Sequence, residues 1–91
     1  MIDVVPIFLR VRRTDIAYIK FVVESYEGLG IVRTLDRHAA IIVMLVTPDF
    51  EDTARDLVAT LTDRLACEEI PWPPQASEDW LLRPEPDDTV R

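Results

Sequence analysis

The sequence has few of the residues on which enzyme and metal sites most often depend. Its 91 residues include two glycines, one cysteine and one histidine. The two glycines do not form a GxGxxG dinucleotide-binding loop or a P-loop, and a lone cysteine excludes an internal disulfide. One histidine without a cysteine nearby does not supply the ligands of a zinc site. We therefore expect no cofactor, no metal and no enzymatic activity.

Long hydrophobic runs and positive charge are also scarce. The longest apolar run, Ala39–Val46, has eight residues, whereas a membrane helix needs about 20. The formal net charge is −7, which disfavours nucleic-acid binding because that binding depends on cations that neutralise phosphates. The positive charges near the start follow an apolar stretch, the reverse of a secretory signal. These features predict a cytoplasmic protein that contacts neither nucleic acid nor membrane.

Two isolated reactive side chains are expected to have ordinary roles. His38 falls in a short polar turn, where a histidine is usually solvated. Cys67 lies near the end of a predicted helix, next to Glu68 and Glu69. Neighbouring carboxylates raise the pKa of a thiol and so suppress its reactivity. We interpret Cys67 as a structural residue.

The hydrophobic pattern that is present predicts five elements in the order β-α-β-β-α. Strands alternate apolar and polar residues, whereas helices repeat apolar residues every three to four positions. The segment at 39–47 is apolar on both faces, which is typical of a central strand covered on both sides. The predicted strands cover 6–13, 30–37 and 39–47, and the predicted helices cover 14–28 and 47–69.

This order predicts an α+β domain with a ferredoxin-like, split β-α-β sandwich, in which both helices cover one face of an antiparallel or mixed sheet. We expect the second and third strands to form an antiparallel hairpin, and the first and third strands to lie parallel. The domain spans 1–70. Residues 71–91 form a tail that carries five of the seven prolines, so "IPWPP" can be at most a fourth strand at the edge.

The third strand leaves one apolar face without a helix to cover it. We expect Ile41, Val43 and Leu45 to face one side and the alternate residues to face the other, beside Phe8. Exposed apolar patches mark interfaces, and the tail or a second copy of the chain could cover this one. We predict a homodimer whose interface includes Phe8, Ile42, Met44, Val46, Trp72, Trp80 and Leu81.

The two glycines mark the junction between the first helix and the second strand. Gly28 falls where a left-handed residue ends a helix. Gly30 allows two interpretations, a tight connection that needs a permissive backbone or a position whose missing side chain leaves room for a ligand. The second interpretation places a small-molecule site at Gly28, Leu29, Gly30 and Ile31.

The same junction carries a resemblance to known families. The order of elements, with "YEGLGIVRTLD" between helix and strand, resembles ACT-type domains, small ferredoxin-like modules that often dimerise and bind amino acids. The stretch "YIKFVVESYEGLGIVRTLD", followed by "IIVMLVTPDF" and a helix, is similar to a small bacterial family known as a domain of unknown function, the one numbered 4911. That resemblance covers residues 5–66 and implies no activity.

Two functions follow as expectations. The first is a homo-oligomeric structural or protein-interaction module that uses the apolar sheet face and the tail. The alternative is an ACT-like regulatory module that binds an amino acid or similar metabolite near Gly28–Ile31. A thermal-shift screen separates them, because a bound ligand stabilises the folded state.

Overall fold

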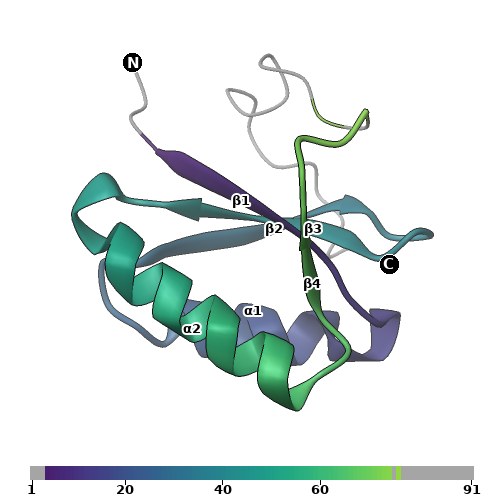
Figure 1. Cartoon of the computed structure of the whole chain (residues 1–91), viewed down its shortest axis with the longest axis horizontal. Coiled ribbons are helices and arrows are strands. Elements are labelled where there is room, and N and C mark those ends of the chain that lie inside the picture. Colours follow the sequence, from purple (N-terminus) through teal and green to yellow (C-terminus); the bar gives the residue numbers. More distant parts are fainter. Residues whose placement is uncertain (1–3, 75, 77–91) are drawn as a thin grey trace.

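The computed structural model describes residues 4–74 and residue 76. These residues form a four-stranded sheet with two helices against one of its faces (Figure 1). A short 3-10 turn precedes each helix, η1 at Arg13–Asp15 and η2 at Pro48–Phe50. The strands and helices are β1 (Val5–Arg10), α1 (Ile16–Glu24), β2 (Gly30–Asp36), β3 (Ile41–Val46), α2 (Glu51–Arg64) and β4 (Glu68–Ile70).

The strand order across the sheet is β2-β3-β1-β4, and every neighbouring pair is antiparallel. The predicted α+β class and the β2–β3 hairpin are confirmed, and the architecture is compatible with a ferredoxin-like fold. The expectation that the first and third strands lie parallel is wrong. The crossover through α1 leaves β1 and β2 running in the same direction, and the hairpin reverses the chain into β3. Because β3 lies between these two strands, it runs antiparallel to both.

The possible fourth strand is present as β4, but it lies before most of the prolines. β4 pairs with β1 through Glu68–Ile70, whereas the helix was expected to continue to residue 69. α2 instead ends at Arg64, and Leu65 takes an extended conformation. This change turns the chain toward the sheet and buries Cys67 in the core. Pairing of β4 with β1 at the sheet edge is therefore favoured over continuation of α2.

The helices cover the opposite set of β3 side chains from the one we expected. Register pairs Ile7 with Met44 and Leu9 with Ile42, and all four side chains are buried against the helices. Val46 belongs to the same cluster. The assignment of Ile42, Met44 and Val46 to the uncovered face is therefore wrong. β3 is apolar on both faces, so its own pattern does not distinguish the helix side from the outer side.

Phe8 does lie on the outer face of the sheet, as expected. It pairs in register with Val43, and the two side chains belong to a second apolar cluster that also contains Leu45 and Ala76. Members of this cluster are buried although the helices lie on the other face. The sheet thus has a core on each side, a large one under the helices and a small one on the outer face.

Candidate functional site

The predicted ligand site lies at the turn between α1 and β2. α1 ends at Glu24, so Gly28 is not its terminal residue as we expected. The amide of Leu29 instead donates to the carbonyl of Tyr26 at 3.1 Å, which closes a separate turn. Gly28 occupies the third position of that turn with φ +83°, the left-handed value that a type II turn requires there. The left-handed conformation expected at Gly28 is confirmed, but in a turn and not at the end of the helix.

Neighbouring groups fill the space that the missing side chains leave. A Cβ atom at Gly28 would lie 3.3 Å from the Phe50 ring. A Cβ atom at Gly30 would overlap the carbonyl oxygen of Leu45 and lie 3.0 Å from the Cα of Val46. The absence of a side chain at Gly30 thus permits close packing of two strands, which accounts for the glycine without a ligand.

The turn is also tied to the start of the second helical segment. The hydroxyl of Thr47 donates to the Gly28 carbonyl at 2.8 Å, and the Thr47 amide donates to the Leu29 carbonyl at 3.0 Å. Leu29 is 1% exposed, whereas Ile31 is 42% exposed on the outer sheet face. Of the four predicted residues, only Ile31 presents a side chain to solvent. The turn has the contacts of a structural junction.

The outer sheet face, where we expected an interface, is covered in part by the same chain. The Trp72 ring lies 5.1 Å from the Phe8 ring, centroid to centroid, at an interplanar angle of 57°. The indole Nε1 of Trp72 donates to the carbonyl of Ala76 at 3.0 Å, which closes the segment over the sheet. Phe8 and Trp72 are therefore in contact as expected, whereas Trp80 and Leu81 lie outside the described residues.

Trp72→Ala should destabilise the chain by about 1–2 kcal/mol. It removes a tilted aromatic pair, worth about 0.5–1.5 kcal/mol beyond area burial, and one hydrogen bond. The melting temperature should fall by roughly 5–10 °C, measured by circular dichroism. Trp72→Phe keeps the ring contact and should lose about half as much. Equal melting temperatures for the wild type and Trp72→Ala would show that this contact does not stabilise the outer face.

An exposed aromatic pair on α1 was not anticipated from the sequence. Tyr18 is 56% exposed and Phe21 is 71% exposed, although both belong to a helix whose opposite face is buried. Residues three apart share one face of a helix. The composition of α1 could have indicated this exposed pair, because seven of the nine residues in "IAYIKFVVE" are apolar. One buried face does not need that many apolar residues.

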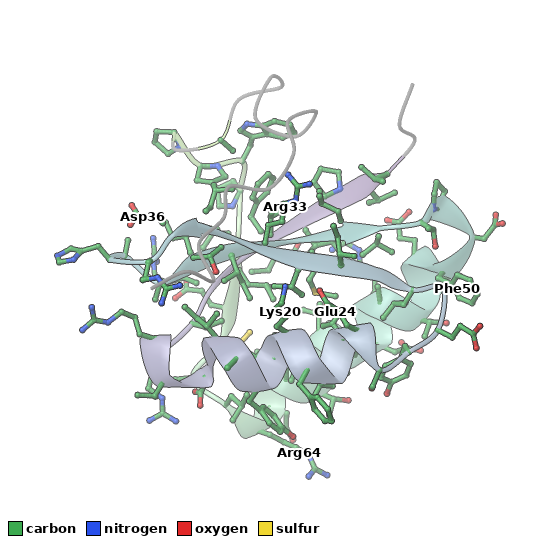
Figure 2. All side chains as sticks on the ribbon, turned by 180° about the vertical axis from the view of Figure 1, so that it is seen from behind. Lys20, Glu24, Arg33, Asp36, Phe50 and Arg64 are labelled. Carbon is green, nitrogen blue, oxygen red and sulfur yellow. The ribbon has the colours of Figure 1, made fainter. Side chains whose placement is uncertain are left out.

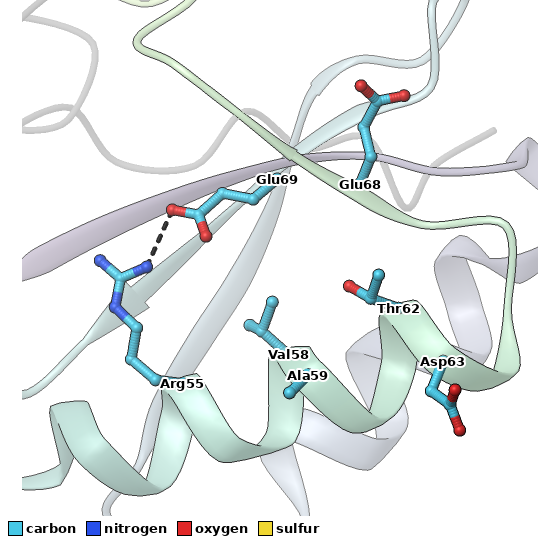
Figure 3. A pocket seen from close by; sticks show the side chains of 7 residues that line it. All are labelled: Arg55, Val58, Ala59, Thr62, Asp63, Glu68 and Glu69. Carbon is cyan, nitrogen blue, oxygen red and sulfur yellow. Dashed lines mark hydrogen bonds and ion pairs between the residues drawn. The ribbon is translucent and has the colours of Figure 1, made fainter.

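A groove between α2 and β4 has a volume of about 590 Å³ (Figure 3). Val58 and Ala59 of α2 contribute its apolar part, and Arg55 crosses one end. Arg55 donates to Glu69 at 2.8 Å, and this hydrogen bond raises the pKa of Arg55. Arg55 and Glu69 thus pair with each other at that end of the groove.

The isolated reactive residues behave largely as expected. His38 is exposed in the β2–β3 turn. Cys67 is buried, and burial raises the pKa of its thiol, with smaller contributions from Asp15 and Glu68 and an opposing one from Thr62. Glu69 does not contribute as we expected, because its carboxylate is turned toward Arg55. A raised pKa keeps Cys67 protonated and weakly nucleophilic at neutral pH.

Two further findings apply to residues 4–74 and 76. Within them, no three His, Cys, Asp or Glu side chains are grouped so that they could hold a metal ion. None of the helices in that range has the length and apolar character needed to cross a membrane.

Comparisons with known proteins identify the family but no activity. No curated protein matches the chain, and no solved structure does. A family model described as a domain of unknown function, DUF4911, matches residues 9–64. That range begins in β1, includes β2 and β3, and ends with α2, so it contains the α1–β2 junction on which the resemblance was based. The chain belongs to the DUF4911 family.

Proposed function

We propose that this chain is a non-catalytic protein-interaction module that associates with a second copy of itself through the exposed face of α1. The observation that carries the proposal is the pair Tyr18 and Phe21, whose side chains are 56% and 71% exposed. Aromatic residues are enriched at protein interfaces. We also infer a split β-α-β arrangement, which the position of β3 between β1 and β2 supports.

The contrast between the two helices supports this assignment. α2 covers the same sheet face as α1, but its solvent side carries charged residues such as Asp52, Asp56 and Arg64. α1 has only two charged residues, Lys20 and Glu24, and both reach toward β2 (Figure 2). The outward face of α1 is therefore uncharged, which is unusual for a helix with one face in water.

A second copy is the partner that the surrounding charges favour. Arg12 and Arg13 precede α1, and Glu27 follows it. If two α1 helices pack antiparallel about a two-fold axis, the basic end of each lies beside the acidic end of the other. The helix dipoles are then also opposed favourably. A self-complementary surface of this kind needs no different partner.

The size of the surface limits the affinity. A nine-residue helix is about 14 Å long, and an interface built on it alone is smaller than the 1,200–2,000 Å² typical of stable complexes. We therefore expect a reversible dimer with a dissociation constant in the micromolar range or weaker. The soluble, cytoplasmic location expected from the sequence is compatible with such an equilibrium.

Phe21→Asp should make the protein monomeric at all accessible concentrations. The side chain is 71% exposed, so folding should change by less than about 0.5 kcal/mol, whereas two buried aspartates would oppose dimerisation. Sedimentation velocity across a concentration series measures the change. Thr60→Asp, an exposed position of α2 flanked by Asp56 and Arg64, is the control and should dimerise normally. A wild-type protein that stays monomeric into the millimolar range contradicts the proposal.

The ACT-like alternative, an amino-acid site at Gly28–Ile31, has less support. The Phe50 ring and the Leu45 carbonyl occupy the positions beside the two glycines, so a ligand could enter only if Phe50 moved. A reproducible rise in melting temperature with one amino acid would favour the ACT-like function over the interaction module.

A further inference from the structure

Side chains of α1 cover the outer edge of β2 at Val32. β2 is an end strand of the sheet formed by residues 4–74 and 76, so one side of its backbone has no neighbouring strand among these residues. On that side, the amide of Val32 donates to Glu24 Oε2 at 3.1 Å, and the Val32 carbonyl accepts from Lys20 Nζ at 3.2 Å. Lys20 and Glu24 also form an ion pair at 3.3 Å. Figure 2 shows both side chains rising from α1 toward the sheet.

This arrangement matters because an open strand edge is a template for pairing with another chain. Natural proteins protect such edges with charged side chains, short strands or covering elements. The other edge strand, β4, is only three residues long, whereas β2 has seven. Lys20 and Glu24 therefore lie at the longer of the two edges, which has more backbone groups to protect.

We propose that β2 is a pairing surface for the β2 strand of a second copy, and that Lys20 and Glu24 form a clamp that keeps this surface closed. With the clamp in place, self-association is restricted to surfaces other than the sheet edge. Without it, two sheets join edge to edge. The proposal concerns a different surface from the α1 face and does not require that α1 dimerise.

The register of β2 makes a second copy a suitable occupant. Val32 directs both its amide and its carbonyl outward, so two antiparallel β2 strands centred on Val32 would exchange the two bonds that the clamp now satisfies. That register places Ile31 of each copy opposite Arg33 of the other. A register centred on Arg33 is disfavoured, because it would place like charges directly opposite each other.

The test removes the clamp in a chain whose α1 surface is already disabled. Lys20→Ala/Glu24→Ala is combined with Phe21→Asp in the full chain, and sedimentation velocity is compared with Phe21→Asp alone. We expect the clamp variant to form dimers at concentrations at which Phe21→Asp is monomeric. Glu51→Ala, which breaks an ion pair of the same i, i+4 spacing on α2 and leaves the Arg55–Glu69 contact to β4 in place, is the control and should remain monomeric.

Amide exchange at Val32 gives a second readout that does not depend on mass. In Glu24→Gln, which keeps the shape of the side chain but loses the charge, Val32 exchange should accelerate about tenfold or more. In the clamp variant, exchange should be fast when dilute and slow when concentrated, because the partner strand then protects the amide. A clamp variant that stays monomeric, with a Val32 amide that is fast at every concentration, overturns the pairing proposal. Unchanged exchange in Glu24→Gln overturns the clamp itself.

The two proposals fail in different ways. If Phe21→Asp leaves the wild-type association unchanged, the α1 surface is wrong, and the clamp is still tested by the difference between the variants with and without Lys20 and Glu24. If only that difference is absent, the α1 proposal stands alone.

Discussion

Gly30→Ala should unfold the protein or lower its stability by at least about 3 kcal/mol. The new Cβ would overlap the Leu45 carbonyl oxygen and approach the Leu45 carbonyl carbon and the Val46 Cα to 3.0 Å. These are backbone atoms of β3, so no side-chain rotation relieves the contact. Overpacking of this kind costs about 1–3 kcal/mol, and φ of +156° adds backbone strain of similar order.

Gly28→Ala is the matched control, because it introduces the same methyl group two residues away. Its φ of +83° costs about 1–2 kcal/mol for a residue with a side chain. The nearest atom is the Cε2 of Phe50 at 3.3 Å, in a ring that is 41% exposed and free to shift. Thermal denaturation should show a fall of more than about 12 °C for Gly30→Ala and less for Gly28→Ala. The reverse order would show that the approach of β2 to β3 is looser than described.

This contrast affects how a ligand site at the turn can be studied. A larger residue at Gly30 removes the fold, so loss of binding in such a variant carries no information about a pocket. Phe50 is the better position for that purpose, because its exposed ring contacts Gly28 and can be truncated while β2 and β3 stay paired. A ligand site at the turn is therefore best tested by substitutions at Phe50 of η2.

Much of the fold could be predicted from local patterns. The alternation at Ile7 and Leu9 identified the buried face of β1, and the uninterrupted run at 39–47 identified β3 as central. Amphipathic periodicity located α2, with Ala54 and Leu61 toward the core. These predictions succeeded because a single element with one buried face carries the signal within its own residues.

Other features depend on pairs of elements that are far apart in the sequence. The covered side of β3 is decided by its register with β1, which an all-apolar strand does not encode. The end of α2 at Arg64 is decided by the pairing of β4 with β1. Lys20 and Glu24 look like an ordinary surface pair at i, i+4, and only the position of Val32 reveals their second role. Each of these features is determined by tertiary contacts between separate elements.

Ile42→Ala should lower the free energy of unfolding by about 2–5 kcal/mol. Ile42 is 0% exposed and pairs with Leu9 and Thr34 on the two neighbouring strands. Truncation removes buried methyl groups and leaves a cavity under both helices, which the surrounding core fills only in part. For a domain with a total stability of about 5–15 kcal/mol, this is a large share. Urea denaturation should show a lower midpoint with an unchanged slope.

Ile31→Ala and Ile42→Val separate this explanation from an interface role for Ile42. Ile31 is 42% exposed on the outer face of β2, so its truncation should cost less than about 1 kcal/mol. Ile42→Val removes one buried methylene and should cost about 0.5–1.5 kcal/mol, while the dimer equilibrium measured by sedimentation stays as in the wild type. If Ile42→Val weakened association without changing stability, Ile42 would belong to an interface and the helices would not cover that face of β3. The expected result, lost stability with unchanged association, places Ile42 in the core and agrees with the proposed interface on α1.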